Sequence, residues 1–130
     1  EVKFARSYLY LAKERFGNSI EASVNVDDRV SQKLIPPLSM QVILENIIYT
    51  NALDKEKPLY IRIYVHNEKE LCIANTKQEK IIRQNLNVDE GLDNLVMKYK
   101  MLNAPPVNIV DDKDERKLLL AFVDQQEEAI

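Results

Sequence analysis

Two hydrophobic periodicities alternate along the chain, one typical of amphipathic helices and the other of strands. Apolar side chains recur at helical spacing from Ala5 to Phe16, and Gly17 then ends the predicted helix. Apolar and polar residues alternate strictly from Ile20 to Val26, which predicts a half-buried strand. The chain therefore begins with a helix followed directly by a strand.

The middle of the chain predicts a second helix and a hairpin. Residues 36–37 are prolines, and the apolar helix predicted over 38–53 starts at or just after them. Residues 59–66 again alternate between apolar and polar side chains. A polar turn over 67–70 leads into a returning strand over 71–75, which predicts a β-hairpin.

The segment 76–90 is polar and has little periodicity, which is typical of a lid or binding loop. After Gly91, apolar residues at helical spacing predict an amphipathic helix over 92–102. Strands are then predicted at 107–110 and 117–123.

The two last strands are joined by a charged segment, 111–116, that reads as a solvated turn, and residues 124–130 read as a flexible tail. Strands grouped in hairpins with helices between them predict an α+β two-layer sandwich rather than a doubly wound parallel sheet.

Length, composition and charge exclude several classes of protein for this chain. The 130 residues suffice for one domain, and 18 basic against 21 acidic residues, with no basic stripe, argue against nucleic acid as a partner. Cys72 is the single cysteine, so neither an internal disulfide nor a zinc cluster is predicted. No apolar run reaches the ~18 residues of a membrane span. Because Glu1 already lies in a helical pattern, we interpret the chain as a fragment of a longer protein.

The helix over 38–53 carries the adjacent polar pair Glu45 and Asn46 among apolar residues. A carboxylate and an amide inside such a helix are costly unless a partner satisfies them. Facing a cavity, they could hold a water and a hard cation such as Mg²⁺, which prefers oxygen ligands. At the edge of the apolar stripe, they would simply meet solvent. The helix alone leaves both alternatives open.

These elements, in this order, resemble the ATP-binding catalytic domain of sensor histidine kinases. The stretch 34–53, the strand pair ending at Asn75 and the helix segment 90–102 carry the resemblance, together with 8–28, which resembles the linker after the dimerisation helices. The similarity is to LytS-type kinases of the GHKL (Bergerat) ATPase superfamily. It implies a mixed sheet with helices on one face.

The resemblance assigns roles to the polar pair and to the end of the hairpin. It implies that Asn46 ligates Mg²⁺, while Glu45 supports catalytic water or phosphate geometry. Residues 49–51, beginning with Tyr49, stand where the family has Lys-His-Gly, so a cation is missing from the phosphate site. Asn75 stands where an acid takes the adenine amino group, and its amide oxygen can act as an uncharged acceptor.

The family's third motif, Gly-x-Gly-Leu-x-Asn, is partly kept. Gly91, Leu92 and Asn94 match it, and the resemblance implies that they bind the nucleotide near the phosphates. The first glycine is replaced by Asp89, and with Glu90 and Asp93 three carboxylates lie beside the phosphate position. They would repel a triphosphate unless Mg²⁺ or a lysine such as Lys77 or Lys80 intervenes.

Two functions within this fold remain open, and a third lies outside it. The first is an ATP- and Mg²⁺-dependent kinase domain that transfers the γ-phosphoryl group to a histidine outside the chain. The second is a degenerate domain that acts as a regulatory or dimer-partner module, because the chain holds only 2 glycines, Gly17 and Gly91. The third is an unrelated α+β protein-interaction domain.

The kinase interpretation also predicts the setting of the chain. Residues 1–18 would end the dimerisation linker, 19–123 would form the ATPase-like domain with a lid at 76–90, and 124–130 would be a tail. Partners would be a response regulator and a second protomer, bound through upstream helices. The domain would be the cytoplasmic part of a membrane-anchored bacterial sensor. His66, the single histidine, lies on the polar side of a strand and is interpreted as a surface residue.

Overall fold

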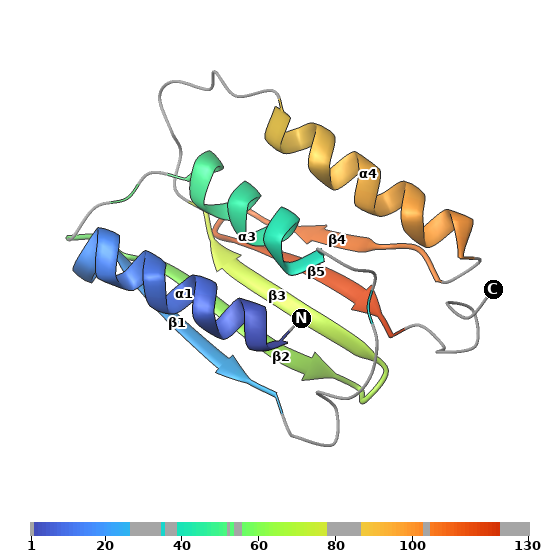
Figure 1. Cartoon of the computed structure of the whole chain (residues 1–130), viewed down its shortest axis with the longest axis horizontal. Helices are drawn as coiled ribbons and strands as arrows, with labels where there is room; N and C mark the ends of the chain where they lie inside the picture. Colours follow the sequence, from blue (N-terminus) through green and yellow to red (C-terminus); the bar gives the residue numbers. More distant parts are fainter. Residues whose placement is uncertain are drawn as a thin grey trace.

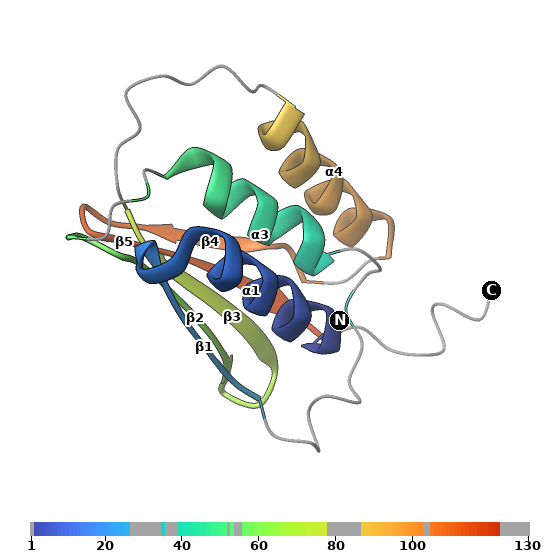
Figure 2. The same cartoon turned by 60° about the vertical axis from the view of Figure 1, so that its left-hand side comes forward.

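Helices cover one face of a five-stranded sheet in the computed structural model of the protein (Figure 1). The structure describes residues 2–26, 35, 39–51, 53, 56–77, 87–102 and 105–122. The covering helices are α1 (Val2–Phe16), α3 (Ser39–Thr50) and α4 (Asn87–Met101). Seen from another side, the helices form one layer and the sheet the other (Figure 2). The predicted α+β two-layer sandwich with helices on one face is confirmed.

The sheet is mixed, with the strand order β1-β2-β3-β5-β4. β1 pairs with β2 in parallel, and the other neighbouring strands are antiparallel. The strands are β1 (Ile20–Asn25), β2 (Leu59–His66), β3 (Glu70–Thr76), β4 (Asn108–Asp111) and β5 (Glu115–Ala121). The parallel pair follows because the chain passes through α3 between β1 and β2, whereas short turns join the hairpin strands.

The hairpin turn between β2 and β3 is tight. Asn67 and Glu68 have φ values of 54° and 62°, and the amide of Lys69 donates to the carbonyl oxygen of His66 at 3.2 Å. Positive φ at both central positions is the pattern of a type I′ turn, whose twist matches that of the flanking strands. The turn therefore ends one residue earlier than the sequence predicted, and β3 starts at Glu70.

The core lies between the helices and the covered face of the sheet. Alternate residues of β2, such as Ile61 and Ile63, are buried there, as the strand periodicity predicted. The largest fully buried side chains are Tyr99, Ile20, Met40, Ile43, Leu44, Leu59, Ile61, Ile63, Leu71, Ile73, Leu120 and Asn46. Asn46 is therefore the one polar amide among the largest buried side chains of the described residues.

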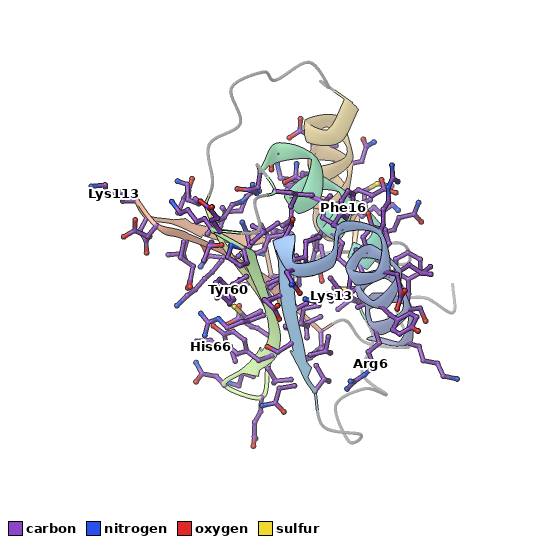
Figure 3. All side chains as sticks on the ribbon, turned by 90° about the vertical axis from the view of Figure 1, so that its left-hand side faces the viewer. Arg6, Lys13, Phe16, Tyr60, His66 and Lys113 are labelled. Carbon is purple, nitrogen blue, oxygen red and sulfur yellow. The ribbon has the colours of Figure 1, made fainter. Side chains whose placement is uncertain are left out.

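The opposite face of the sheet is not covered by these helices. Tyr60 and His66 point to that side in Figure 3, away from Lys13 and Phe16 at the helical layer. Both Tyr60 and His66 are exposed. The polar side of β2 is therefore not covered by the first helix, and the interpretation of His66 as a surface residue agrees with its position.

The starts of α4 and β5 also differ from the sequence prediction. α4 begins at Asn87, so Gly91 lies within the helix rather than before it. β5 begins at Glu115, two residues before the predicted start. Most of the predicted lid (78–86, including Lys80) and the tail 124–130 lie outside the described residues.

Candidate functional site

Three polar side chains meet at one end of the covered face of the sheet. Asn75 on β3 and Arg116 on β5 are directly paired across the two strands. Above them, the amide oxygen Oδ1 of Asn46 on α3 accepts a hydrogen bond from Nη1 of Arg116 at 3.2 Å. Figure 1 shows the C-terminal part of α3 lying over this end of β3 and the β4–β5 hairpin. We call Asn46, Asn75 and Arg116 the amide–guanidinium cluster.

Asn46 is held in an apolar environment. Only 1% of its surface is exposed, because the surrounding residues of α3 face the core. A buried amide without a partner would cost about 1–3 kcal/mol of stability. The charged donor of Arg116 meets this need, and hydrogen bonds to charged groups are stronger than neutral ones. The contact therefore fastens α3 to β5 and fixes the direction of the Asn46 side chain.

Glu45 lies in a more exposed environment than the adjacent Asn46. Successive residues of a helix point about 100° apart, and Glu45 is only half-buried. Its Oε1 accepts a hydrogen bond from Nε2 of Gln41, one turn earlier, at 3.2 Å. The polar pair is thus split: Asn46 faces the interior, and Glu45 lies at the edge of the apolar stripe.

Asn75 is the second buried amide of the cluster, with 4% of its surface exposed. Its Nδ2 donates to the carbonyl oxygen of Thr76 at 2.9 Å. No donor from the described residues reaches its Oδ1. That oxygen can accept a hydrogen bond from an exocyclic amino group, as the sequence predicted for adenine.

Arg116 is the residue that the sequence analysis missed, because 111–116 was interpreted as a solvated turn. The structure places Arg116 within β5, on the same face as Leu118 and Leu120. The alternation of these three residues was the signal that could have found it. Arg116 is half-buried, and within the described part of the chain it forms no ion pair.

A second cation lies at the same end of the sheet but is already neutralised. Nζ of Lys77, just after β3, is 2.7 Å from Oδ1 of Asp111 and donates to the carbonyl oxygen of Asp112 at 2.9 Å. The backbone amide of Lys77 also donates to the carbonyl oxygen of Asp114. Lys77 therefore ties the end of β3 to the β4–β5 hairpin, which leaves Arg116 as the half-buried cation here without a described carboxylate partner, beside the exposed Lys113 of the turn.

The chain is similar to sensor histidine kinases both in sequence and in fold. It is 26% identical over 118 residues to the sensor histidine kinase/phosphatase LytS of several Staphylococcus aureus strains, such as Mu50 and N315. The match covers 78% of this chain but only 20% of LytS, so the chain spans about a fifth of the length of these relatives. No family model matches the chain.

Among solved structures, the mycobacterial sensor histidine kinase MprB has the same fold. The TM-score is 0.52 with 13% sequence identity, and the match covers 95% of both chains. The resemblance to sensor histidine kinases is confirmed. The sequence match to LytS and the fold match to MprB together support a catalytic-type domain of a sensor kinase.

The other residues that the kinase resemblance singled out are distributed over α3 and α4. Tyr49 lies in α3 and Gly91 in α4. Leu92 is partly buried and packs against the core, whereas Asn94 is exposed. Their nucleotide contacts stay predictions. The structure connects Asn46 with the Asn75 region through Arg116, but no described contact joins Gly91, Leu92 or Asn94 to that cluster.

Among the described residues, the contacts of Asn46 bear on whether Mg²⁺ fits at this site. No group of three or more His, Cys, Asp or Glu side chains that could hold a metal ion occurs in the described part of the chain. Mg²⁺ prefers octahedral oxygen coordination that includes carboxylates. Here the predicted ligand atom, Oδ1 of Asn46, instead accepts a hydrogen bond from a cation. The assignment of Asn46 as a magnesium ligand therefore stays a prediction.

Proposed function

We propose that this chain is the nucleotide-binding domain of a sensor histidine kinase, and that it binds ATP over the amide–guanidinium cluster. The observation that carries the proposal is the contact between Asn46 and Arg116 directly beside Asn75. The cluster combines a guanidinium, which can bind phosphate oxygens, with an amide oxygen that can accept from adenine. The similarity to LytS supports the kinase assignment.

In this proposal, the chain contributes mainly position and charge to phosphoryl transfer, since the reaction needs little covalent chemistry from the protein. Asn75 orients the base and Asn46 holds the guanidinium of Arg116 toward the phosphates. The γ-phosphoryl group passes to a histidine outside this chain. A response regulator and a second protomer are the proposed partners. The proposed setting, the cytoplasmic side of a membrane-anchored sensor, rests on the resemblance to LytS, and no described helix is long and apolar enough to cross a membrane.

A regulatory module with little affinity for nucleotide is the second candidate function. It is favoured by the loss of the family's glycines and by the three acids Asp89, Glu90 and Asp93. Few glycines mean that backbone N–H groups approach the phosphates less closely. The two candidates differ in one measurable quantity, the affinity for ATP.

Nucleotide binding is expected to be weak. Because the acids repel a triphosphate and the glycine loops are missing, we expect a dissociation constant for a non-hydrolysable ATP analogue above about 1 μM, or roughly −8 kcal/mol. Calorimetry with the analogue, in the presence and absence of Mg²⁺, measures it. A tighter constant would contradict the expected weakness, and no detectable binding would favour the regulatory module.

Replacing Asn46 by alanine is expected to weaken analogue binding about tenfold or more, or about 1.4 kcal/mol. The change removes the acceptor that holds Arg116 in place. It also lowers the free energy of unfolding by about 1–3 kcal/mol, because the half-buried guanidinium of Arg116 loses its partner. Calorimetry and thermal unfolding of the same samples separate the two effects. A loss confined to the Mg²⁺ titration would support the predicted metal ligation.

Tyr99→Phe is the control. Tyr99 is fully buried in α4, and its hydroxyl donates to the carbonyl oxygen of Ala121 at 2.8 Å. Ala121 lies at the end of β5 away from Arg116. This variant should lose stability but keep the affinity of the parent. Equal analogue affinities in Asn46→Ala and the parent would refute the proposed role of Asn46.

A further inference from the structure

We propose that Arg116 supplies the positive charge that neutralises the nucleotide's phosphates, so that this site binds nucleotide without a divalent metal. The inference rests on the proposed function, since it concerns how the same cluster recognises ATP. It adds a specificity-determining residue, Arg116, and a metal-independent mode of binding. Three observations support the inference. They are the missing carboxylate partner of Arg116, the fixed position of its guanidinium and the distance at which a metal on Asn46 would lie from it.

The first observation is that Arg116 is the one half-buried cation at this end of the described sheet that has no carboxylate partner, whereas Lys113 in the β4–β5 turn is exposed to solvent. Lys77 is paired with Asp111 at 2.7 Å. On the opposite face, Arg62 and Lys117 share the carboxylate of Glu115. A half-buried guanidinium without a carboxylate partner is available to bind the oxygens of an anion.

The second observation is that the guanidinium is held in position before any ligand arrives. One of its N–H groups donates to the buried oxygen of Asn46. A guanidinium has five N–H donors, so others remain for an anion. Its planar fork matches phosphate oxygens in a bidentate manner, which an amide or a lysine cannot do. Most of the conformational entropy of the Arg116 side chain is therefore lost on folding, and little more is lost when a ligand binds.

The third observation concerns the place that a metal would occupy. A Mg²⁺ ion bound to Oδ1 of Asn46 would lie about 2.1 Å from it. Nη1 of Arg116 is 3.2 Å from the same oxygen. The two cations would then lie within about 5 Å of each other, well inside the screening length of about 8 Å. The two positive charges would repel each other at this distance, so the guanidinium disfavours a Mg²⁺ ion at this oxygen.

The test is analogue binding by calorimetry, in saturating Mg²⁺ and in EDTA, for the parent and for Arg116→Gln. The parent should bind equally, within about twofold, in both conditions. Arg116→Gln should lose about tenfold or more in EDTA, and Mg²⁺ should restore part of the loss because the repelling charge is gone. Arg116→Lys keeps the charge but not the planar group that binds two phosphate oxygens at once. It should therefore give an intermediate loss of affinity in EDTA.

Lys117→Gln is the matched control. It removes the same charge from the adjacent residue of β5, whose side chain pairs with Glu115 on the other face of the sheet. It should bind like the parent, and thermal unfolding should confirm that every variant is folded. If Arg116→Gln does not fold, Arg116→Lys and the metal dependence of the parent still decide the matter.

Four other results would each overturn the inference, and each points to a different cause. Binding by the parent only with Mg²⁺, unchanged in Arg116→Gln, refutes the role of Arg116 and leaves the nucleotide function intact. Tighter binding by Arg116→Gln in EDTA means that the arginine blocks the site. Equal losses in Lys117→Gln and Arg116→Gln mean that only net charge matters. No binding by any protein in either condition overturns the proposed nucleotide function itself.

Discussion

Tyr99→Ala should lower the free energy of unfolding by about 3–5 kcal/mol, the range for removing a large buried aromatic side chain. Tyr99 of α4 is fully buried, and its hydroxyl donates to the carbonyl oxygen of Ala121 in β5 at 2.8 Å. Burial raises the pKa of the phenol well above its ordinary value, so the hydroxyl stays a neutral donor. Urea denaturation followed by circular dichroism measures the loss.

Two control variants separate the parts of this effect. Tyr99→Phe keeps the ring and leaves one buried carbonyl without its donor, so we expect a loss of about 1–2 kcal/mol. Tyr10→Ala changes an exposed tyrosine of α1, 66% accessible, and should stay within about 0.5 kcal/mol of the parent. A loss for Tyr99→Ala no larger than that for Tyr10→Ala would contradict the described packing of α4 on the sheet.

The order of helices and strands was predictable because most elements carry a strong period. The alternation in β2 predicted which residues are buried, and Ile61 and Ile63 are indeed in the core. Boundaries were less predictable. β5 starts in the charged segment, because Glu115 and Arg116 find partners across the sheet and above it that no local pattern reveals.

Only part of the candidate site could be predicted from the sequence, because its third residue is brought there by contacts across the sheet. Asn46 stood out as a polar residue among apolar ones, Asn75 was singled out by the family resemblance, and both are buried. Their common neighbour Arg116 is 70 residues away from Asn46 in the chain. Contacts of that range depend on strand order and register, which the periodicity of a single strand does not determine. Arg116 therefore appeared only as part of a charged turn.

The last prediction is that this chain does not phosphorylate itself, whatever its affinity for ATP. Transfer to histidine needs an imidazole nitrogen about 3–3.5 Å from the γ-phosphorus, in line with the leaving oxygen. His66 is the single histidine. It is paired with Glu70 at one end of the β2–β3 hairpin, whereas Asn75 is paired with Ile61 at the other. The two pairs are five residue steps apart along β2, or about 17 Å at ~3.3 Å per residue.

The direction of His66 adds to this distance. Its side chain is exposed and points to the side of the sheet away from the helices (Figure 3), while Asn46 and Arg116 meet on the covered side. Incubation with γ-labelled ATP should therefore leave no acid-labile label on the chain, and His66→Gln should behave identically. A longer form of the protein that carries the proposed acceptor helix should be labelled under the same conditions. Label on the chain that disappears in His66→Gln would overturn both the placement of His66 and the proposal that the acceptor lies outside these residues, because the imidazole would have to reach a nucleotide bound on the opposite face of the sheet.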